Sequence, residues 1–261
     1  MKNSILFYKF VMGFTVLGFL ISCQNQKIDH RFQNEFCINS TGKKLPYRIF
    51  IPEQQDSIQK YPLIIFLHGG TGAGTNNIDQ ISGKNRSGSH IWLEEEIQLK
   101  YPAFVLCPQL PPFQRWNDPL SDSLTVYTKM FFNLIDSLMI TNPIDTNRIY
   151  LTGQSLGGWG VWYLIGKRPE IFAAAIPVCG GGNPETANAA KSVAIWAFHG
   201  AFDRDVSVEK SREMVEVFEE TGSDIKYTEF FFGGHSIWDD VYSDQNVIDW
   251  LFKQSKNNKS F

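Results

Sequence analysis

Hydrophobic and polar positions along the chain follow two patterns, one typical of strands and one of helices. Residues 63–67 form an unbroken apolar run, as expected for a strand covered on both faces. Residues 124–138 place polar and acidic residues between apolar positions at helical spacing, and a Pro at 143 follows. The same patterns predict further strands at 32–38, 45–51, 103–106, 148–151, 172–178, 193–198 and 225–232, and further helices at 91–99, 159–166 and 208–220.

Strands alternate with helices through most of the chain, which predicts an α/β fold with a mainly parallel central sheet of about eight strands and helices on both faces. In such sheets the ligand binds beyond the carboxyl ends of the strands. We expect one domain at 34–254 and a polar tail at 255–261. The connection between 178 and 193 is too short for a large cap domain, which favours an open cleft.

The N-terminus has the composition of a targeting segment. Residues 1–22 combine two lysines with an apolar run that is shorter than the roughly 20 residues of a spanning helix. The run ends in Leu-Ile-Ser-Cys, which resembles a bacterial lipobox in which Cys23 is lipidated. This predicts a signal peptide, a polar tether at 23–33, and an extracytoplasmic lipoprotein anchored to a membrane at the periplasm or cell surface. The alternative is an ordinary signal peptide with a chance cysteine.

Net charge limits the kinds of binding partner to expect, and cysteine content limits the number of disulfides. Removing 1–22 takes away two lysines and no acid, so the formal net charge changes from −3 to −5. A mildly acidic chain does not attract nucleic acid, and no nucleic-acid partner is expected. Cys37, Cys107 and Cys179 then remain, which allows at most one disulfide. Cys107 and Cys179 both end apolar runs and could pair, but buried free thiols are the favoured interpretation.

A candidate nucleophile lies where a predicted strand meets a predicted helix. Gly-Gln-Ser-Leu-Gly occupies 153–157, and this arrangement is a nucleophile elbow. The glycines allow a turn so tight that side chains at their positions would collide with neighbouring elements. The turn raises Ser155 to the N-terminus of the helix. The motif alone is common, and its position between strand and helix is what makes it informative.

A serine nucleophile needs a base and a carboxylate that orients the base. His235 is the best base, because it follows a predicted strand through two glycines and comes after Ser155 in the chain. The acid should lie between them, after the strand at 193–198. Asp203 and Asp205 both satisfy this condition, and the spacing does not choose between them.

The developing oxyanion needs two backbone N–H groups. One is expected from Leu156, directly after the nucleophile. The other is expected from the loop after the strand at 63–67, where the sequence is His-Gly-Gly-Thr-Gly. We assign it to Gly70, with Thr71 as the alternative. His68 is interpreted as a structural residue that holds this loop.

Five segments resemble α/β-hydrolase esterases of the phospholipase/carboxylesterase and polysaccharide-esterase type (acetyl xylan and feruloyl esterases). They are HGG (68–70), GQSLGGWG (153–160), PVCGGG (177–182), HGAFDRDV (199–206) and GGHSIWDDVY (233–242), and the similarity runs from about 36 to 252. The resemblance implies the α/β-hydrolase fold, the order Ser-Asp-His, and Asp203 as the acid. It also implies action on carboxylic esters, often of short or aromatic acyl groups on sugars, without cofactor or metal. Ser207 stands where relatives often carry proline.

Three further residues are candidates for substrate contact. Trp116 and Trp238 lie in segments expected near the mouth of the site, where their rings could stack on a sugar or an aromatic acyl group. Gln154 precedes the nucleophile. Simple packing of the loops is an equally good interpretation of each.

Together these features predict a serine carboxylesterase that acts through an acyl-enzyme on small esters or on acylated polysaccharide. A serine peptidase of the prolyl-oligopeptidase type uses the same groups, but such enzymes usually carry an additional large domain. A non-catalytic, glycan-binding surface lipoprotein is the third interpretation.

Overall fold

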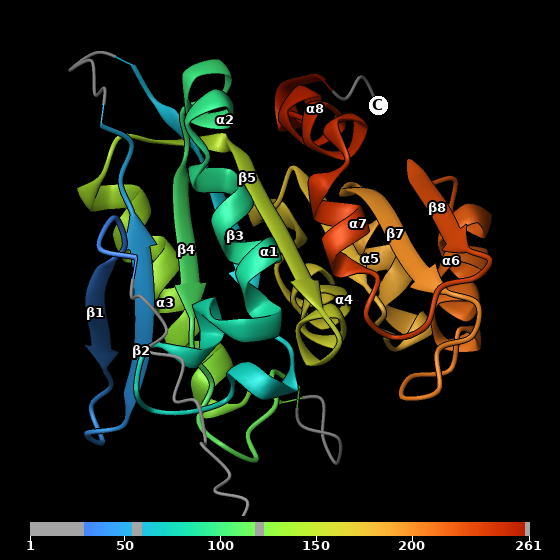
Figure 1. Ribbon diagram of the computed structural model, residues 1–261, viewed down its shortest axis with the longest axis horizontal. Helices are drawn as coiled ribbons and strands as arrows, with labels where there is room; N and C mark the ends of the chain where they lie inside the picture. The colour runs from blue at the N-terminus through green and yellow to red at the C-terminus, as the bar shows by residue number, and fades with distance from the viewer. Residues whose placement is uncertain (1–28, 54–58, 118–122, 259–261) are drawn as a thin grey trace, which may run out of the picture.

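The structure is a computed structural model and describes residues 29–53, 59–117 and 123–258. These residues form one eight-stranded sheet of order β1-β2-β4-β3-β5-β6-β7-β8 (Figure 1). β2 pairs antiparallel with β1 and β4, and all other neighbours are parallel, which confirms the expected sheet. The strands are β1 (Gln33–Ile38), β2 (Lys44–Phe50), β3 (Tyr61–Leu67), β4 (Phe104–Pro108), β5 (Ile144–Gln154), β6 (Ala174–Val178), β7 (Ala194–Gly200) and β8 (Ile225–Phe230).

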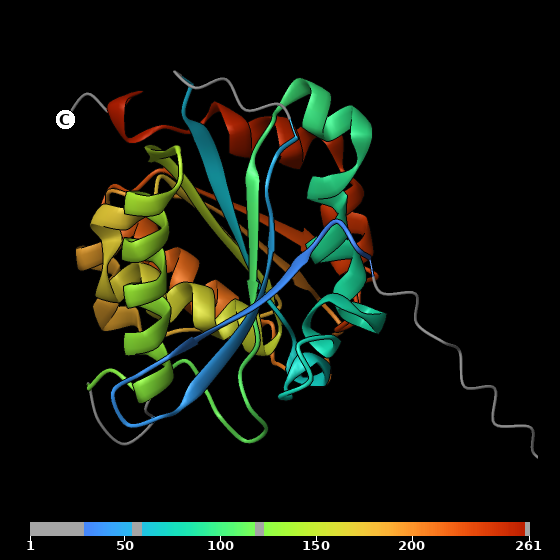
Figure 2. The ribbon, with the colours of Figure 1, turned by 90° about the vertical axis from the view of Figure 1, so that its left-hand side faces the viewer.

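Helices cover both faces of the sheet, as the sequence predicted (Figure 2). One face carries α3, α4, α5 and α6, and the other carries α1, α2, α7 and α8. The helices are α1 (Arg86–His90), α2 (Glu95–Lys100), α3 (Val126–Thr141), α4 (Leu156–Lys167), α5 (Ala187–Ala190), α6 (Glu209–Glu220), α7 (Trp238–Ser243) and α8 (Gln245–Lys253). None of the described helices is long and apolar enough to cross a membrane.

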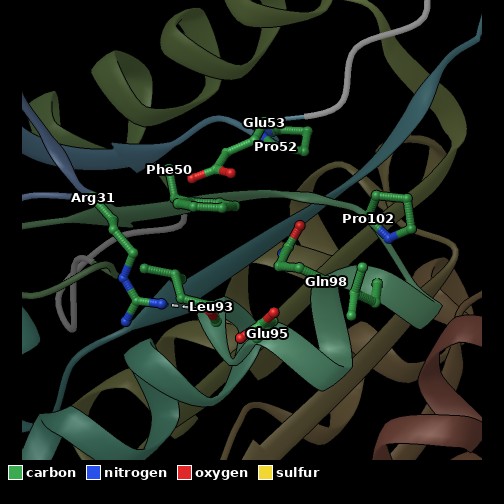
Figure 3. Close-up of a pocket in the computed structure, with 9 residues that line it drawn as sticks. Arg31, Phe50, Pro52, Glu53, Leu93, Glu95, Gln98 and Pro102 are labelled. Atoms are coloured by element: carbon green, nitrogen blue, oxygen red, sulfur yellow. Dashed lines mark hydrogen bonds between the residues drawn. The ribbon is translucent and has the colours of Figure 1, made fainter.

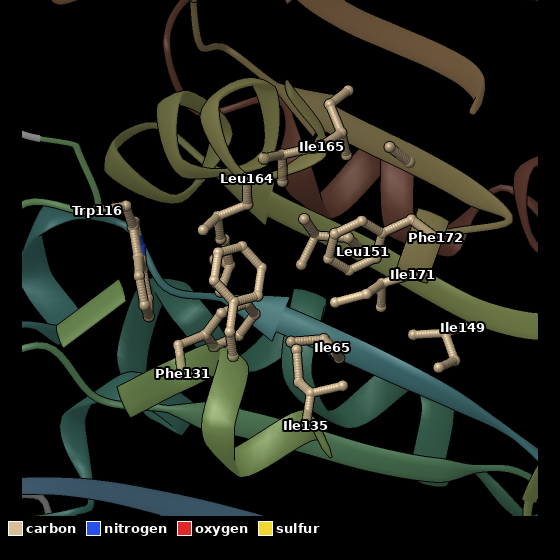
Figure 4. Close-up of a cluster of buried hydrophobic side chains, with 14 of the residues drawn as sticks. Ile65, Trp116, Phe131, Ile135, Ile149, Leu151, Leu164, Ile165, Ile171 and Phe172 are labelled. Carbon is tan, nitrogen blue, oxygen red and sulfur yellow. The ribbon is translucent and has the colours of Figure 1, made fainter. Parts of the chain in front are cut away.

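The continuous apolar run of β3 is explained by the two cores that it separates. Leu63, Ile65 and Leu67 point into the cluster beneath α3 and α4, part of which Figure 4 shows. Ile64 and Phe66 point into the cluster on the opposite face. Because side chains alternate along a strand, a strand covered on both sides must be apolar at every position.

Two predicted boundaries are wrong for local reasons. The helix predicted at 91–99 is two segments, the 3₁₀ turn η4 (Ile91–Leu93) and α2, because Glu94 between them is extended, with φ −60° and ψ 138°. α4 begins at Leu156 rather than at 159, so it starts directly after the candidate nucleophile.

The folded domain begins earlier than the predicted tether allows. Phe32 is 2% exposed, and the Arg31 guanidinium donates to the Leu93 carbonyl at 2.6 Å, so residues placed in the tether already pack on the domain. At the other end, the predicted tail contributes the turn η7 (Lys256–Asn258). The signal peptide and Cys23 lie outside the described residues.

The cysteines of the described chain, Cys37, Cys107 and Cys179, are all free. Burial raises the pKa of the Cys107 and Cys179 thiols, that of Cys179 to about 12, so both stay protonated near neutral pH. The pairing of Cys107 with Cys179 that the sequence left open does not form.

The contact between α4 and β3 generates a stability prediction. A Cβ on Gly157 would lie 2.0 Å from the Leu67 carbonyl oxygen, whereas a Cβ on Gly70 would meet nothing within 4 Å. We expect Gly157→Ala to lower the free energy of unfolding by about 2 kcal/mol or more. Gly70→Ala should change it by less than about 0.5 kcal/mol. Urea unfolding followed by circular dichroism measures both, and equal stability of the two variants would contradict the prediction.

Candidate active site

Ser155 lies in the turn between β5 and α4, in a backbone conformation that few side chains adopt. Its φ is 54° and its ψ −115°, and strain of this kind costs about 1–3 kcal/mol. The Ser155 amide donates to the Val178 carbonyl at 2.9 Å, which fixes the turn to β6. A Cβ on Gly153 would lie 2.8 Å from backbone atoms of Gly157, so only glycine fits there. Packing therefore holds the strained serine at the carboxyl end of the sheet.

His235 reaches the serine from the segment after β8. Its Nε2 lies 2.8 Å from the Ser155 Oγ. The segment is fixed to the neighbouring loop, because the Phe202 amide donates to the Gly233 carbonyl at 2.8 Å. The Trp238 ring meets the imidazole edge to face, with 5.5 Å between centroids. The imidazole is thus held in place by both backbone and packing.

Asp203, in the loop between β7 and α6, completes the set. Its Oδ2 lies 2.7 Å from the His235 Nδ1, and its side chain is 0% exposed. Its Oδ1 accepts from the amides of Asp205 and Val206, each at 2.9 Å. Burial raises the pKa of the Asp203 carboxyl, but these amides and His235 outweigh burial and hold it below its ordinary value. Asp205 is exposed, and its backbone amide donates a hydrogen bond to the Asp203 carboxylate. The geometry therefore selects Asp203 as the acid from the two candidates.

The two proposed oxyanion donors both open a helical segment. Leu156 is the first residue of α4, and Gly70 is the first residue of the 3₁₀ turn η1 (Gly70–Gly72). The first amides of a helix have no acceptor within it and are available to a ligand. Thr71, the alternative donor, lies in the same turn. By contrast, the Gly69 amide is already used, since it donates to the Asn85 side chain at 2.8 Å.

His68 holds this loop from the interior. The Leu110 amide donates to its Nε2 at 3.0 Å, so its proton lies on Nδ1, which donates to the Gly69 carbonyl at 2.7 Å. Burial lowers the pKa of His68 to about 4, which keeps the ring neutral. This geometry fits the structural role that the sequence suggested.

The three residues considered for substrate contact lie in the interior. Trp116 is 1% and Trp238 5% exposed, so neither presents an open ring face to solvent, but Trp116 does line a small pocket beside Leu156. Gln154 is also buried, and its amide donates to the Lys84 carbonyl at 2.8 Å, which ties the elbow to the loop before α1. The spacing of apolar residues could not reveal that these side chains are buried, because it does not show which face of a loop is covered.

A small pocket beside the elbow is lined by a residue, Trp159, that was not among the candidates from the sequence. Its volume is about 230 Å³, and it adjoins Leu156, whose amide is a proposed oxyanion donor. Trp159, Trp116 and Gly160 are among the other residues that line it. Trp159 follows the G-x-S-x-G motif closely, and this position one turn into α4 was the signal that could have identified it.

A second missed feature is an exposed group of rings, Phe202, Phe231 and Phe232, here called the phenylalanine patch. These side chains are 61%, 68% and 90% exposed. Ring centroids lie 6.2 Å apart for Phe202 and Phe231 and 4.9 Å apart for Phe231 and Phe232. The strand predicted at 225–232 included two of them, but β8 ends at Phe230, and the rings instead occupy the turn that leads to His235.

Another pocket, of about 450 Å³, lies away from these groups (Figure 3). Arg31, Phe50, Leu93 and Gln98 are among the residues that line it, at the end of the sheet where β4 begins. The nucleophile lies at the opposite end, where β5 finishes.

Two sets of side chains bring metal-ligand atoms within 4.8 Å of one another in the described chain, and both include Asp203. Its two oxygens already accept hydrogen bonds from amides and from His235. The member common to both sets is therefore occupied by protein groups, and its hydrogen bonds to His235 and to two amides fit proton transfer.

No protein-family model matches the chain. Among curated proteins, it is 27% identical over 137 residues to dipeptidyl-peptidase 5 of Porphyromonas gingivalis, a match that covers 51% of this chain and 19% of that protein. Among solved structures, a thermostable esterase superposes with a TM-score of 0.82 at 36% identity, covering 87% of this chain and 64% of the other. This chain thus spans less than two thirds of either relative.

A feruloyl esterase module from Clostridium thermocellum superposes with a TM-score of 0.64 at 16% identity, covering 86% of this chain and 88% of that one, which shows a shared fold. The strand order, the elbow after β5 and the esterases among the structural neighbours agree with one another. This chain is a member of the α/β-hydrolase superfamily.

Proposed function

We propose that this chain is a serine carboxylesterase that cleaves carboxylic esters through an acyl-enzyme on Ser155. The observation that carries the proposal is the continuous hydrogen-bonded path from Ser155 Oγ through His235 to the buried Asp203 carboxylate, at 2.8 and 2.7 Å. A hydroxyl, an imidazole and a carboxylate in this geometry form a nucleophile, a general base and a group that orients the base.

The proposed reaction follows from these positions. His235 removes the Ser155 proton while Oγ attacks the ester carbonyl, and Asp203 stabilises the imidazolium that forms. The amides of Leu156 and Gly70 receive the oxyanion, each worth about 2.7–4 kcal/mol of barrier if it acts like other such donors. The His235 proton then passes to the departing alcohol. A water activated by the same imidazole cleaves the acyl-enzyme, so the residues return to their starting state.

The nature of the acyl group is suggested by the pocket beside Leu156. At about 230 Å³ it suits a short or flat acyl group better than a long chain. The structural neighbours include a thermostable esterase and a feruloyl esterase module. We therefore propose acyl groups on small alcohols or on polysaccharide as the substrate class.

The decisive test is the substitution Ser155→Ala. With p-nitrophenyl acetate as substrate, we expect the unaltered chain to hydrolyse the ester and Ser155→Ala to lose roughly 10⁴-fold or more in kcat. Ser137→Ala, an exposed serine on α3, is the matched control and should retain full activity. An unaltered chain without any hydrolysis would instead favour the non-catalytic, glycan-binding alternative.

A peptidase of the prolyl-oligopeptidase type is the second candidate. It is favoured by the similarity to dipeptidyl-peptidase 5, although this chain spans only 19% of that protein. The same Ser155 assay run with dipeptide p-nitroanilides separates the two. Cleavage of the anilides but not of acetate esters would promote the peptidase.

The phenylalanine patch supports an ester with a bulky alcohol. Three of the eight exposed large hydrophobic side chains of the described chain gather here, whereas singly exposed ones are ordinary. The patch belongs to the loops that carry Asp203 and His235. Because His235 delivers its proton to the departing alcohol, the alcohol occupies the side of the site that this histidine faces. We propose that a large alcohol group, such as a sugar ring, extends onto these rings.

Replacing all three rings tests this idea. We expect the Phe202→Ser, Phe231→Ser, Phe232→Ser variant to lose about tenfold more kcat/KM on acetylated oligosaccharide than on methyl acetate, because the lost apolar contact is worth about 1.4 kcal/mol. Phe36→Ser, an exposed ring on β1, is the control and should leave the ratio unchanged. An equal loss on both esters would rule out contact with the alcohol.

We also propose that Cys23 carries the lipid anchor that the sequence suggested. Expressed with its own N-terminus in a bacterium that processes lipoproteins, the chain should fractionate with membranes. Cys23→Ala should move it to the soluble fraction, while Cys37→Ala, a half-buried thiol of β1, should not. A membrane-bound Cys23→Ala variant would contradict lipidation at this residue.

A further inference from the structure

The Asp203 carboxylate has a second imidazole partner that the proposed mechanism does not use. His199, near the end of β7, is 0% exposed, and its Nε2 lies 3.1 Å from the Asp203 Oδ2. The same oxygen receives the His235 Nδ1 at 2.7 Å. Oδ1 accepts two amides, so N–H groups lie against both oxygens of this carboxylate. Two histidines therefore share one oxygen, one facing the nucleophile and one facing the interior.

The position of the proton on His199 follows from its neighbours. Nε2 faces two oxygens that cannot donate, the Asp203 carboxylate and the Val206 carbonyl at 3.0 Å. Nδ1 lies 2.7 Å from the Ser211 Oγ, which is also 2.9 Å from the Gly180 carbonyl. If Ser211 donates to Nδ1, the ring is neutral with its proton on Nε2. If Ser211 donates to Gly180, both nitrogens are protonated. In either case Nε2 carries a proton that the Val206 carbonyl accepts at 3.0 Å, with the Asp203 Oδ2 beside it at 3.1 Å.

Burial favours the neutral form of the His199 ring, because it lowers the pKa of His199. Besides Asp203 and the His235 that shares it, the titratable groups around the ring are Cys179 and Glu229. Burial raises the pKa of the Cys179 thiol to about 12, so it is uncharged. Glu229 is paired with the Arg212 guanidinium at 2.6 Å, which leaves His199 facing one carboxylate through one N–H.

We propose that His199 is a positioning residue whose Nε2–H, shared between the Val206 carbonyl and Asp203, weakens the hold of Asp203 on a protonated His235. The proposal rests on the proposed function for its kinetic consequence only. A carboxylate that already accepts a hydrogen bond from one imidazole stabilises a positive charge on the other less strongly. Removing the His199 N–H should therefore strengthen the attraction between Asp203 and a charged His235.

The test is an NMR titration of His235 in three variants. His199→Leu removes the donor at similar volume, and His199→Gln keeps an N–H donor at a similar distance. His90→Gln replaces a buried histidine outside the triad and is the matched control. We expect the His235 titration midpoint to rise by about one pH unit in His199→Leu and to stay within about 0.3 unit in the other two. The acidic limb of the kcat/KM profile should move in the same direction.

A folded His199→Leu variant with an unmoved His235 midpoint would overturn the proposal, and so would a loss of rate without a shift. If His199→Leu does not fold, ¹⁵N spectra of the unaltered chain decide. A proton on the His199 Nε2 supports the proposal, and an unprotonated Nε2 refutes it. Because the titration needs no turnover, a shifted midpoint in a chain that cleaves no ester would reject the proposed function and leave this inference standing.

Discussion

The site depends on how closely α4 approaches β3. At Gly157 an added Cβ would lie 2.0 Å from the Leu67 carbonyl oxygen, and at Gly153 it would meet the backbone of Gly157. Helix and sheet can pack at this distance only if the chain turns sharply between them, which gives Ser155 its φ of 54°. The many contacts of the surrounding core stabilise a conformation that the isolated turn would avoid. The strain therefore positions the hydroxyl without any group having to move.

With Ser155 held in place, the charge that acts on His235 comes from Asp203, which contacts the imidazole nitrogen opposite the serine. The Asp203 side chain is 0% exposed, yet its carboxyl has a lowered pKa because two backbone amides and His235 donate to it. A negative charge held in this way is not weakened by solvent, and it acts on His235 at 2.7 Å. Asp205, two residues further on, is exposed, and water would screen a charge there. Burial thus distinguishes two aspartates that the sequence could not.

The sequence revealed the parts of the fold that follow from repeated patterns. Apolar runs predicted each strand, and the ends of those strands predicted where Ser155, Asp203 and His235 would lie, because parallel strands finish at one edge. The sequence did not show which side chains of a single loop are buried and which are exposed. Trp238 is buried against the imidazole and Trp116 beneath α4, while Phe231 and Phe232 are exposed although an apolar pattern included them in a strand. His199 was overlooked because a buried histidine in a strand has no distinct pattern.

The same distinction between sheet and loops separates the residues proposed for the reaction from those proposed to select the substrate. Ser155, Asp203 and His235 each follow a strand of the sheet, which the chain shares with a thermostable esterase and a feruloyl esterase module. The pocket beside Trp159 and the phenylalanine patch are built instead from residues in loops or on a helix surface. If these residues contact the acyl and alcohol groups as proposed, a change in them alters which group fits without disturbing the approach of α4 to β3. Substrate choice can therefore diverge faster than the reaction itself.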